Sequence, residues 1–155
     1  MTLERTSIRQ LMSERLETIA MSSSAQAAAK KMRDKNISSL IVTDDYNKPV
    51  GIVTERDLVR KICVNDASSS NTKVKDVMSL PILTINSTAS VREAANIMTQ
   101  NRVRHVLVIE NNDISKPLGI VTPSDFAGYL KENLFIDDVN AKILLQSIQE
   151  ESRKD

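Results

Sequence analysis

Hydrophobic and polar residues recur in the same order in two parts of this chain. Apolar side chains take the i, i+3, i+4, i+7 spacing of one buried helical face twice, at Ala25, Ala28, Ala29 and Met32 and again at Val91, Ala94, Ala95 and Met98. Segments rich in Ser and Thr, residues 22–24 and 87–90, precede the two stretches and are typical of helix N-caps. The pattern therefore predicts two equivalent amphipathic helices.

Short runs rich in β-branched residues surround each predicted helix and are typical of strands. In the first part, the extended segments are residues 17–20, 37–42 and 50–53, followed by a helix from Glu55 to about Cys63. In the second part, the same order occupies residues 82–86, 103–109 and 118–121, followed by a helix from Pro123 to about Leu130. A polar turn ending in Lys-Pro separates the last two strands of each part.

The two parts align directly with one another, which indicates an internal duplication. Residues from Ile8 onward match those from Val74 onward at a shift of 66 positions, and each copy includes a Met-Ser pair. Two extra residues in a polar turn, where insertions cost little, raise the shift to 68, at which Gly51 matches Gly119. Because the chain has only three glycines, this shared position indicates a requirement of the backbone.

The duplication divides the chain into two repeats, residues 7–63 and 73–130, joined by a polar linker at 64–72. The remaining residues, 131–155, form an extension. Within it, residues 137–151 carry Val139, Ile143, Leu144 and Ile148 on a charged background, which predicts an amphipathic helix. Such a helix either covers the core of its own fold or offers a surface to a second copy or a protein partner.

Composition and charge fit a folded globular chain, because 41% of the 155 residues are hydrophobic and 26% are charged. A net charge of +1 and an aromatic content of 3% provide neither a field nor stacking platforms for nucleic acid. The sequence has no long apolar run and no signal-peptide pattern, so we expect no membrane contact and a cytoplasmic location. The single cysteine, Cys63, excludes an intramolecular disulfide and fits a reducing compartment.

Motifs that would indicate catalysis are missing. The chain has one histidine and lacks a Cys-x-x-Cys pair, a phosphate loop, a Gly-x-Gly-x-x-Gly segment and a Gly-x-Ser-x-Gly elbow. The paired carboxylates at 44–45 and 137–138 stand where turns and helix starts favour Asp. We therefore expect a chain that is not an enzyme and that holds no metal ion.

In both repeats, Gly-Ile-Val-Thr is followed by an Asp three residues after the Thr. Thr54 with Asp57, and Thr122 with Asp125, have the spacing of a capping box, and a cap alone is worth about 1 kcal/mol. The same positions also place free backbone N–H groups at the carboxyl end of a strand, where a helix start binds phosphate. The Asp would then accept from ribose hydroxyls, so a structural and a ligand-binding interpretation both stand.

Two copies of Gly-Ile-Val-Thr-x-x-Asp, each preceded by the same strands and helix, resemble a tandem pair of cystathionine beta-synthase (CBS) domains, also named a Bateman module. The resemblance covers residues 7–130. It implies an α/β (α+β) fold of two β-α-β-β-α repeats with pseudo-twofold symmetry and nucleotide clefts between the repeats. It also implies an adenosine-containing ligand, AMP, ADP or ATP, with S-adenosylmethionine or a dinucleotide in fewer members, and no other cofactor.

The resemblance further implies which residues contact a nucleotide. Asp57 and Asp125 would hold ribose hydroxyls beside Thr54 and Thr122, and Ile52 and Ile120 would pack on adenine. Positions that often carry basic residues for phosphates are Ser38 and Ser39 in the first repeat but Arg104 and His105 in the second, with Arg56 adding charge beside Asp57. The expected set also includes Thr18, Thr84 and Ser124.

We therefore expect a regulatory module that binds an adenine nucleotide and signals to a protein partner or through its own homodimer. The alternative is a structural or protein-interaction module that binds no nucleotide and whose Thr-Asp pairs are only helix caps.

Overall fold

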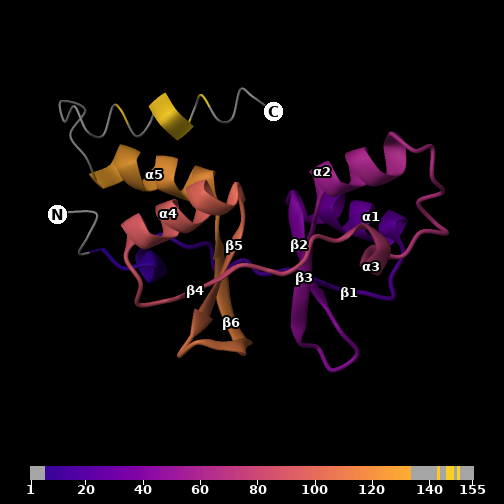
Figure 1. The fold of residues 1–155 in the computed structure, drawn as a ribbon, viewed down its shortest axis with the longest axis horizontal. Helices are drawn as coiled ribbons and strands as arrows, with labels where there is room; N and C mark the ends of the chain where they lie inside the picture. The colour runs from indigo at the N-terminus through magenta and orange to yellow at the C-terminus, as the bar shows by residue number, and fades with distance from the viewer. Residues whose placement is uncertain (1–5, 134–142, 144–145, 149, 151–155) are drawn as a thin grey trace. The chain divides into compact units, whose positions relative to one another are not determined.

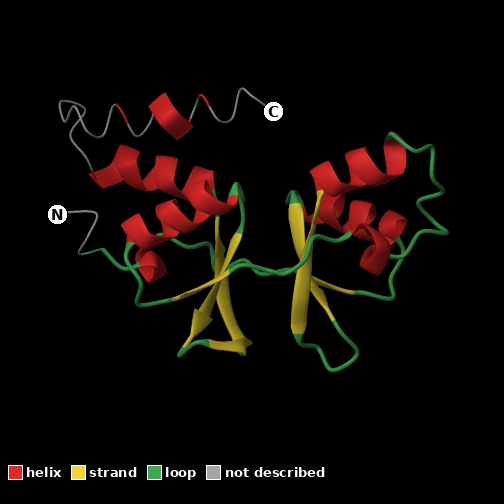
Figure 2. Cartoon of the chain, viewed as in Figure 1, coloured by secondary structure: helices red, strands yellow, loops and turns green. Residues whose placement is uncertain are grey.

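The computed structural model describes residues 6–133, 143, 146–148 and 150. These residues form two compact units, each built on a three-stranded sheet. The first, named here the Asp57 unit, contains residues 15–83 and 113–116; the second, the Asp125 unit, contains residues 6–14, 84–112 and 117–133. In each unit the helices lie against one face of the sheet (Figures 1 and 2).

The Asp57 unit follows the predicted order of strand, helix, strand, strand and helix. Its elements are β1 (Thr18–Ala20), α1 (Ala25–Lys35), β2 (Ser39–Thr43), β3 (Pro49–Thr54), α2 (Glu55–Leu58), the π-helical turn η2 (Val59–Cys63) and the short helix α3 (Val74–Val77). Strand β1 pairs in parallel with β2, and β2 pairs antiparallel with β3. The sheet order is β1-β2-β3.

The Asp125 unit repeats this order. Its elements are the 3-10 turn η1 (Ile8–Gln10), β4 (Thr84–Asn86), α4 (Val91–Asn101), β5 (Val106–Glu110), β6 (Asp113–Val121) and α5 (Pro123–Asn133). Strand β4 pairs in parallel with β5, and the sheet order is β4-β5-β6. The mixed fold class and the β-α-β-β-α order of each repeat are therefore confirmed.

The two amphipathic helices begin where the sequence predicts. Ser24 caps α1 and Ser90 caps α4, each accepting a hydrogen bond on its side chain from the amide three residues later. Both helices bury the positions at i, i+3 and i+7, namely Ala25, Ala28 and Met32 in α1 and Val91, Ala94 and Met98 in α4. The prediction was wrong for Ala29, which is exposed because α1 buries a narrower stripe than the spacing suggested.

The sequence predicted a polar turn at residues 111–115 in the second hairpin. In the structure the turn is shorter and the strand after it is longer. Asn111 and Asn112 both have left-handed backbone angles, with φ of 51° and 58°, and β6 already begins at Asp113. Two consecutive left-handed residues form the two-residue turn that matches the twist of paired strands, and Asn tolerates this conformation well. The inserted residues therefore extend the strand.

The leading segment of each repeat packs on the other repeat. The amide of Ile8 donates to Ala89 O at 2.8 Å, and the amide of Val74 makes the equivalent bond to Ser23 O at 2.8 Å. These contacts place η1 in the Asp125 unit and α3 in the Asp57 unit, where Ile8 and Val74 are fully buried. The sequence repeats and the compact units are therefore two different divisions of the chain.

Most of the amphipathic helix predicted at residues 137–151 lies outside the described residues. Within the part of the chain that the structure describes, no helix is both long enough and apolar enough to span a membrane.

Candidate functional site

The Thr54–Asp57 turn joins the end of β3 to the start of α2. Thr54 Oγ1 accepts a hydrogen bond from the Asp57 amide at 3.1 Å, and Asp57 Oδ2 accepts from the Thr54 amide at 3.0 Å. The Thr54 hydroxyl also donates to Oδ2 at 3.1 Å. These reciprocal bonds form a capping box, so the structural interpretation of the motif is confirmed in the first repeat.

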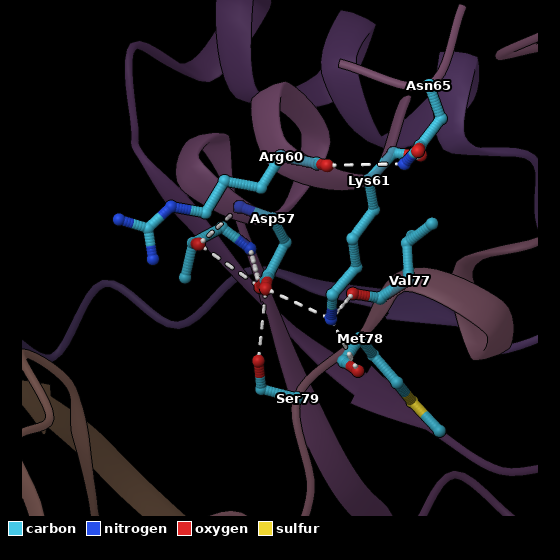
Figure 3. Close-up of polar contacts among 8 residues, drawn as sticks. Asp57, Arg60, Lys61, Asn65, Val77, Met78 and Ser79 are labelled. Atoms are coloured by element: carbon cyan, nitrogen blue, oxygen red, sulfur yellow. Dashed lines mark hydrogen bonds and ion pairs between the residues drawn. The ribbon is translucent and has the colours of Figure 1, made fainter. Parts of the chain in front are cut away.

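The second oxygen of Asp57 is engaged from a different part of the chain. Oδ1 accepts a hydrogen bond from Ser79 Oγ at 3.0 Å and lies 3.3 Å from Lys61 Nζ, one helical turn further along (Figure 3). Lys61 Nζ also donates to Val77 O at 2.6 Å, at the end of α3. The Asp57 carboxylate thus has four donors around it, and the residue is only 9% exposed. We name Asp57, Lys61 and Ser79 the Asp57 clamp.

The equivalent turn of the second repeat has fewer partners. Asp125 Oδ2 accepts from the Thr122 amide at 2.8 Å and from the Thr122 hydroxyl at 3.1 Å. Among the described residues, Thr122 alone donates to this carboxylate, and Asp125 is half-buried. Burial raises the pKa of Asp125, and the hydrogen bonds from Thr122 offset only part of that rise.

A different residue type stands where the second repeat would need a counterpart of Lys61. At the shift of 68, this position is Tyr129, whose Oη lies 2.8 Å from Thr6 Oγ1. Tyrosine supplies no positive charge to the carboxylate one helical turn before it. The two repeats therefore share the hydrogen bonds from Thr to the Asp carboxylate, and they differ in the residue that stands one helical turn after the Asp.

The Met-Ser pair of each repeat lies beside the strand that leads into the Thr-Asp turn of the other repeat. Ile52 exchanges two backbone hydrogen bonds with Ser79, at 3.2 and 2.8 Å, and Ile120 exchanges two with Ser13, both at 2.9 Å. A Cβ atom on Gly51 would stand 2.8 Å from Ser79 O, and one on Gly119 would stand 2.5 Å from Ser13 O. The predicted backbone requirement for these glycines is confirmed, and its cause is close approach of a second segment.

The serines expected near a phosphate do lie next to the Asp57 turn. Ser39 is paired with Thr54 across β2 and β3, and Ser38 O accepts the amide of Glu55, the first residue of α2, at 3.0 Å. Thr18 lies one strand further away, on β1, opposite Ile41 of β2. Arg56 is partly buried in the first turn of α2.

The expected residues of the second repeat occupy matching positions. Arg104, which is exposed, and His105, which is partly buried, directly precede β5, the neighbour of β6 in the sheet. Ser124 is exposed in the first turn of α5, and Thr84 begins β4, opposite Leu107. Ile120 is only 9% exposed, whereas Ile52 is partly buried, so the second repeat presents less isoleucine surface.

Lys61 and Ser79 are the residues of this site that the sequence reasoning missed. The spacing of Asp57 and Lys61, which is i to i+4, would have indicated an ion pair on one helical face. Ser79 gave no comparable signal, because it is 22 residues from Asp57 and only the tertiary structure brings it there. Among the described residues, no group of three or more His, Cys, Asp or Glu side chains could hold a metal ion. Hydrogen bonding and charge are the chemistry that this arrangement offers.

Comparison with known proteins gives a consistent result. The family model described as CBS domain matches the chain twice, over residues 8–63 and 74–132. An uncharacterized protein of Methanopyrus kandleri is 34% identical over 97 residues, which are 63% of this chain and 48% of that protein. The chain therefore spans about half the length of this relative.

Solved structures share the fold. A conserved CBS domain protein of unknown function from Thermoplasma acidophilum has a TM-score of 0.77 at 21% identity, covering 96% of this chain and 76% of that one. A hexameric CBS-CP12 protein from bloom-forming cyanobacteria has a TM-score of 0.72 at 24% identity, covering 96% and 98% of the two chains.

Proposed function

This chain belongs to the CBS domain family as a tandem pair of domains, a typically regulatory and non-catalytic type of module, and we propose that it binds an adenine nucleotide, AMP, ADP or ATP. The observation that carries the proposal is the Asp125 turn. There a half-buried carboxylate stands at the start of a helix, and Thr122 engages only one of its two oxygens. The other oxygen, Oδ1, is available to accept a hydrogen bond from a ribose hydroxyl.

Charge near the turns supports a ligand with phosphates. Arg104 and His105 precede β5, next to the strand that ends in Thr122, and Arg56 lies in the first turn of α2. In this proposal these side chains bind the phosphates, Thr54 and Thr122 stand beside the ribose, and Ile52 and Ile120 contact the adenine. The serines at 38, 39 and 124 and the threonines at 18 and 84 complete the proposed lining.

We propose that the bound state is transmitted to a protein partner or through a homodimer. Self-association has a precedent in the family, since the CBS-CP12 neighbour is a hexamer.

A second candidate function, a structural module without nucleotide, is favoured by the first repeat. Four donors of the chain itself already surround the Asp57 carboxylate, and the residue is 9% exposed. On this alternative, the turns only cap helices and position the Met-Ser segments.

A thermal-shift and calorimetry series separates the two candidates. Wild type, Asp57→Ala and Asp125→Ala would be titrated with AMP, ADP and ATP. A nucleotide at about 100 times its dissociation constant should raise the free energy of unfolding by roughly 2.7 kcal/mol, and Asp125→Ala should remove this gain. No shift with any nucleotide would leave the structural module as the function. A shift that survives both substitutions would move the ligand away from the Asp residues.

A further inference from the structure

The Asp57 clamp engages both carboxylate oxygens of one of the two aspartates. Oδ2 accepts two bonds from Thr54, and Oδ1 accepts from Ser79 Oγ at 3.0 Å with Lys61 Nζ at 3.3 Å. A carboxylate has room for about four hydrogen bonds, and three hydrogen bonds together with the Lys61 ammonium group engage both oxygens of Asp57. A ligand hydroxyl that reached Asp57 would have to displace one of these donors.

Lys61 is held from two sides, which makes it a difficult donor to displace. Its Nζ donates to Val77 O at 2.6 Å and also lies 3.4 Å from Met78 O, so the C-terminal carbonyls of α3 fix it next to Asp57 (Figure 3). The Asp57 side chain is only 12% exposed, against 41% for Lys61. Water therefore screens this pair less than a surface ion pair, and a carboxylate deprived of its cation here would remain desolvated.

The second repeat lacks this obstacle. Tyr129 stands in the position of Lys61, and in the described residues the donors to Asp125 come from Thr122. The raised pKa of Asp125 fits a carboxylate that burial destabilises in its charged form and that would gain from additional donors. Of the two turns, the Asp125 turn is the one in which a carboxylate oxygen, Oδ1, can accept a hydrogen bond from a ligand.

On the basis of the proposed function, we infer that Lys61 is a specificity-determining residue that closes Asp57 to ribose hydroxyls, so that a nucleotide binds first at the Asp125 turn. Lys61, with Ser79, thereby sets how many nucleotides the module binds. The two turns share the hydrogen bonds from Thr to Asp Oδ2, and the occupants of Asp57 Oδ1 decide between them.

The test is a calorimetric titration of the full chain with AMP, ADP and ATP in turn. Wild type should bind one nucleotide per chain in the measured range, and Asp125→Asn should abolish this binding while Asp57→Asn leaves it. In the Asp125→Asn background, Lys61→Met should raise the affinity for the remaining site at least tenfold, which corresponds to about 1.4 kcal/mol. Adding Asp57→Asn should remove this gain in affinity. A 2′,3′-dideoxy nucleotide, which lacks the ribose hydroxyls, should not bind more tightly to the Lys61→Met variant.

Two further variants keep the result interpretable. Lys75→Met removes the same charge from an exposed position of α3 and should change nothing. Ser79→Ala frees one position on Asp57 Oδ1 and leaves the ion pair with Lys61 in place. It should raise the affinity of the Asp57 turn for the nucleotide roughly threefold. This variant tests the inference if Lys61→Met does not fold.

Binding that is unchanged or weakened by both Lys61→Met and Ser79→Ala would overturn the inference, as would loss of the wild-type site on Asp57→Asn. Both results leave nucleotide binding itself intact. Absence of binding in every variant would contradict the proposed function together with the inference.

Discussion

The Asp57 and Asp125 turns have the same local sequence pattern and carry different surroundings. In both, a Thr at the end of a strand is bonded to an Asp three residues later through its amide and its hydroxyl. Around Asp57, Lys61 adds an ion pair and Ser79 adds a hydrogen bond, whereas among the described residues the hydrogen bonds to the Asp125 carboxylate come from Thr122 alone. The comparison teaches that the chain can engage both carboxylate oxygens of a motif in one copy and, among the described residues, only one in the other.

The shared part of the comparison is local, and the difference is tertiary. The bonds from Thr to the Asp carboxylate need only residues within one helical turn, so duplication preserves them. The partners of Asp57 Oδ1 come from the next turn of the helix and from a segment 22 residues away. The helical position differs between the repeats, Lys61 against Tyr129, whereas the other position is a serine in both, Ser79 and Ser13.

The largest expected change in stability comes from a feature that both repeats share, the glycine on the strand that the Met-Ser segment contacts. Gly119→Ala should lower the free energy of unfolding by about 3 kcal/mol and Gly51→Ala by about 2 kcal/mol, because each new Cβ meets a backbone carbonyl that cannot move aside easily. The contact is tighter at Gly119, with 2.5 Å against 2.8 Å at Gly51. Urea denaturation of the two variants measures the difference.

Gly128 provides the matched control. It lies within α5, and a Cβ there would meet nothing within 4 Å. Gly128→Ala should therefore stabilise the chain by about 0.5 to 1 kcal/mol through helix propensity. Equal stability of all three alanine variants would show that the glycines are not required by close approach.

The next effect separates the two aspartates. Asp57→Asn should lower the free energy of unfolding by about 2 kcal/mol, because the neutral side chain loses the ion pair with Lys61. Its amide presents either an N–H₂ group or a weaker acceptor to the donors that now bind the carboxylate. Asp125→Asn should cost less than about 0.5 kcal/mol, since an amide oxygen still accepts both bonds from Thr122. Denaturant titrations of the two variants at neutral pH decide the matter, and similar losses would mean that the turns are energetically equivalent.

Acid titration should sharpen the same contrast. The folded-state pKa of Asp125 lies above its unfolded value, so this carboxyl contributes stability that is fully present below the unfolded pKa of about 3.9 and is lost as the pH rises through the folded pKa. The stability of wild type relative to Asp125→Asn should therefore fall as the pH is raised from about 3 to 7. Thermal unfolding across this range measures it; a difference that grows with pH would contradict the assignment.

The smallest effect concerns the caps of the two long helices. Ser90 and Glu93 form a capping box on α4, and hydrogen bonds from Ser90 lower the pKa of Glu93. In α1 the equivalent partner of Ser24 is Ala27, which is exposed. Ala27→Glu should complete a second box and stabilise the chain by about 0.5 kcal/mol at neutral pH. The comparison variant Ala27→Gln keeps the hydrogen bond without the charge and should gain less.

By itself, the sequence determined the duplication, the order of elements in each repeat, the helix caps and the need for Gly51 and Gly119. These features depend on periodicity, on short spacings or on repetition, all of which can be read along one chain. It also predicted the Thr-Asp pairs as capping boxes. The reciprocal bonds of Thr54 and Asp57 confirm this in the first repeat, whereas the Asp125 amide donates to Thr122 O. The nucleotide-binding role of the same residues stays a proposal.

Only the tertiary structure decided which segments pack together and what surrounds each aspartate. The exchange of η1 and α3 between repeats is set by hydrogen bonds across long stretches of sequence, such as Val74 to Ser23, that no local pattern encodes. Ser79 reaches Asp57 because its segment is fixed on β3 over Gly51, and Lys61 is fixed there by the carbonyls of α3. The charge environment of a buried carboxylate depends on such distant partners, and for this reason the Gly-Ile-Val-Thr-x-x-Asp motif has different surroundings in its two copies.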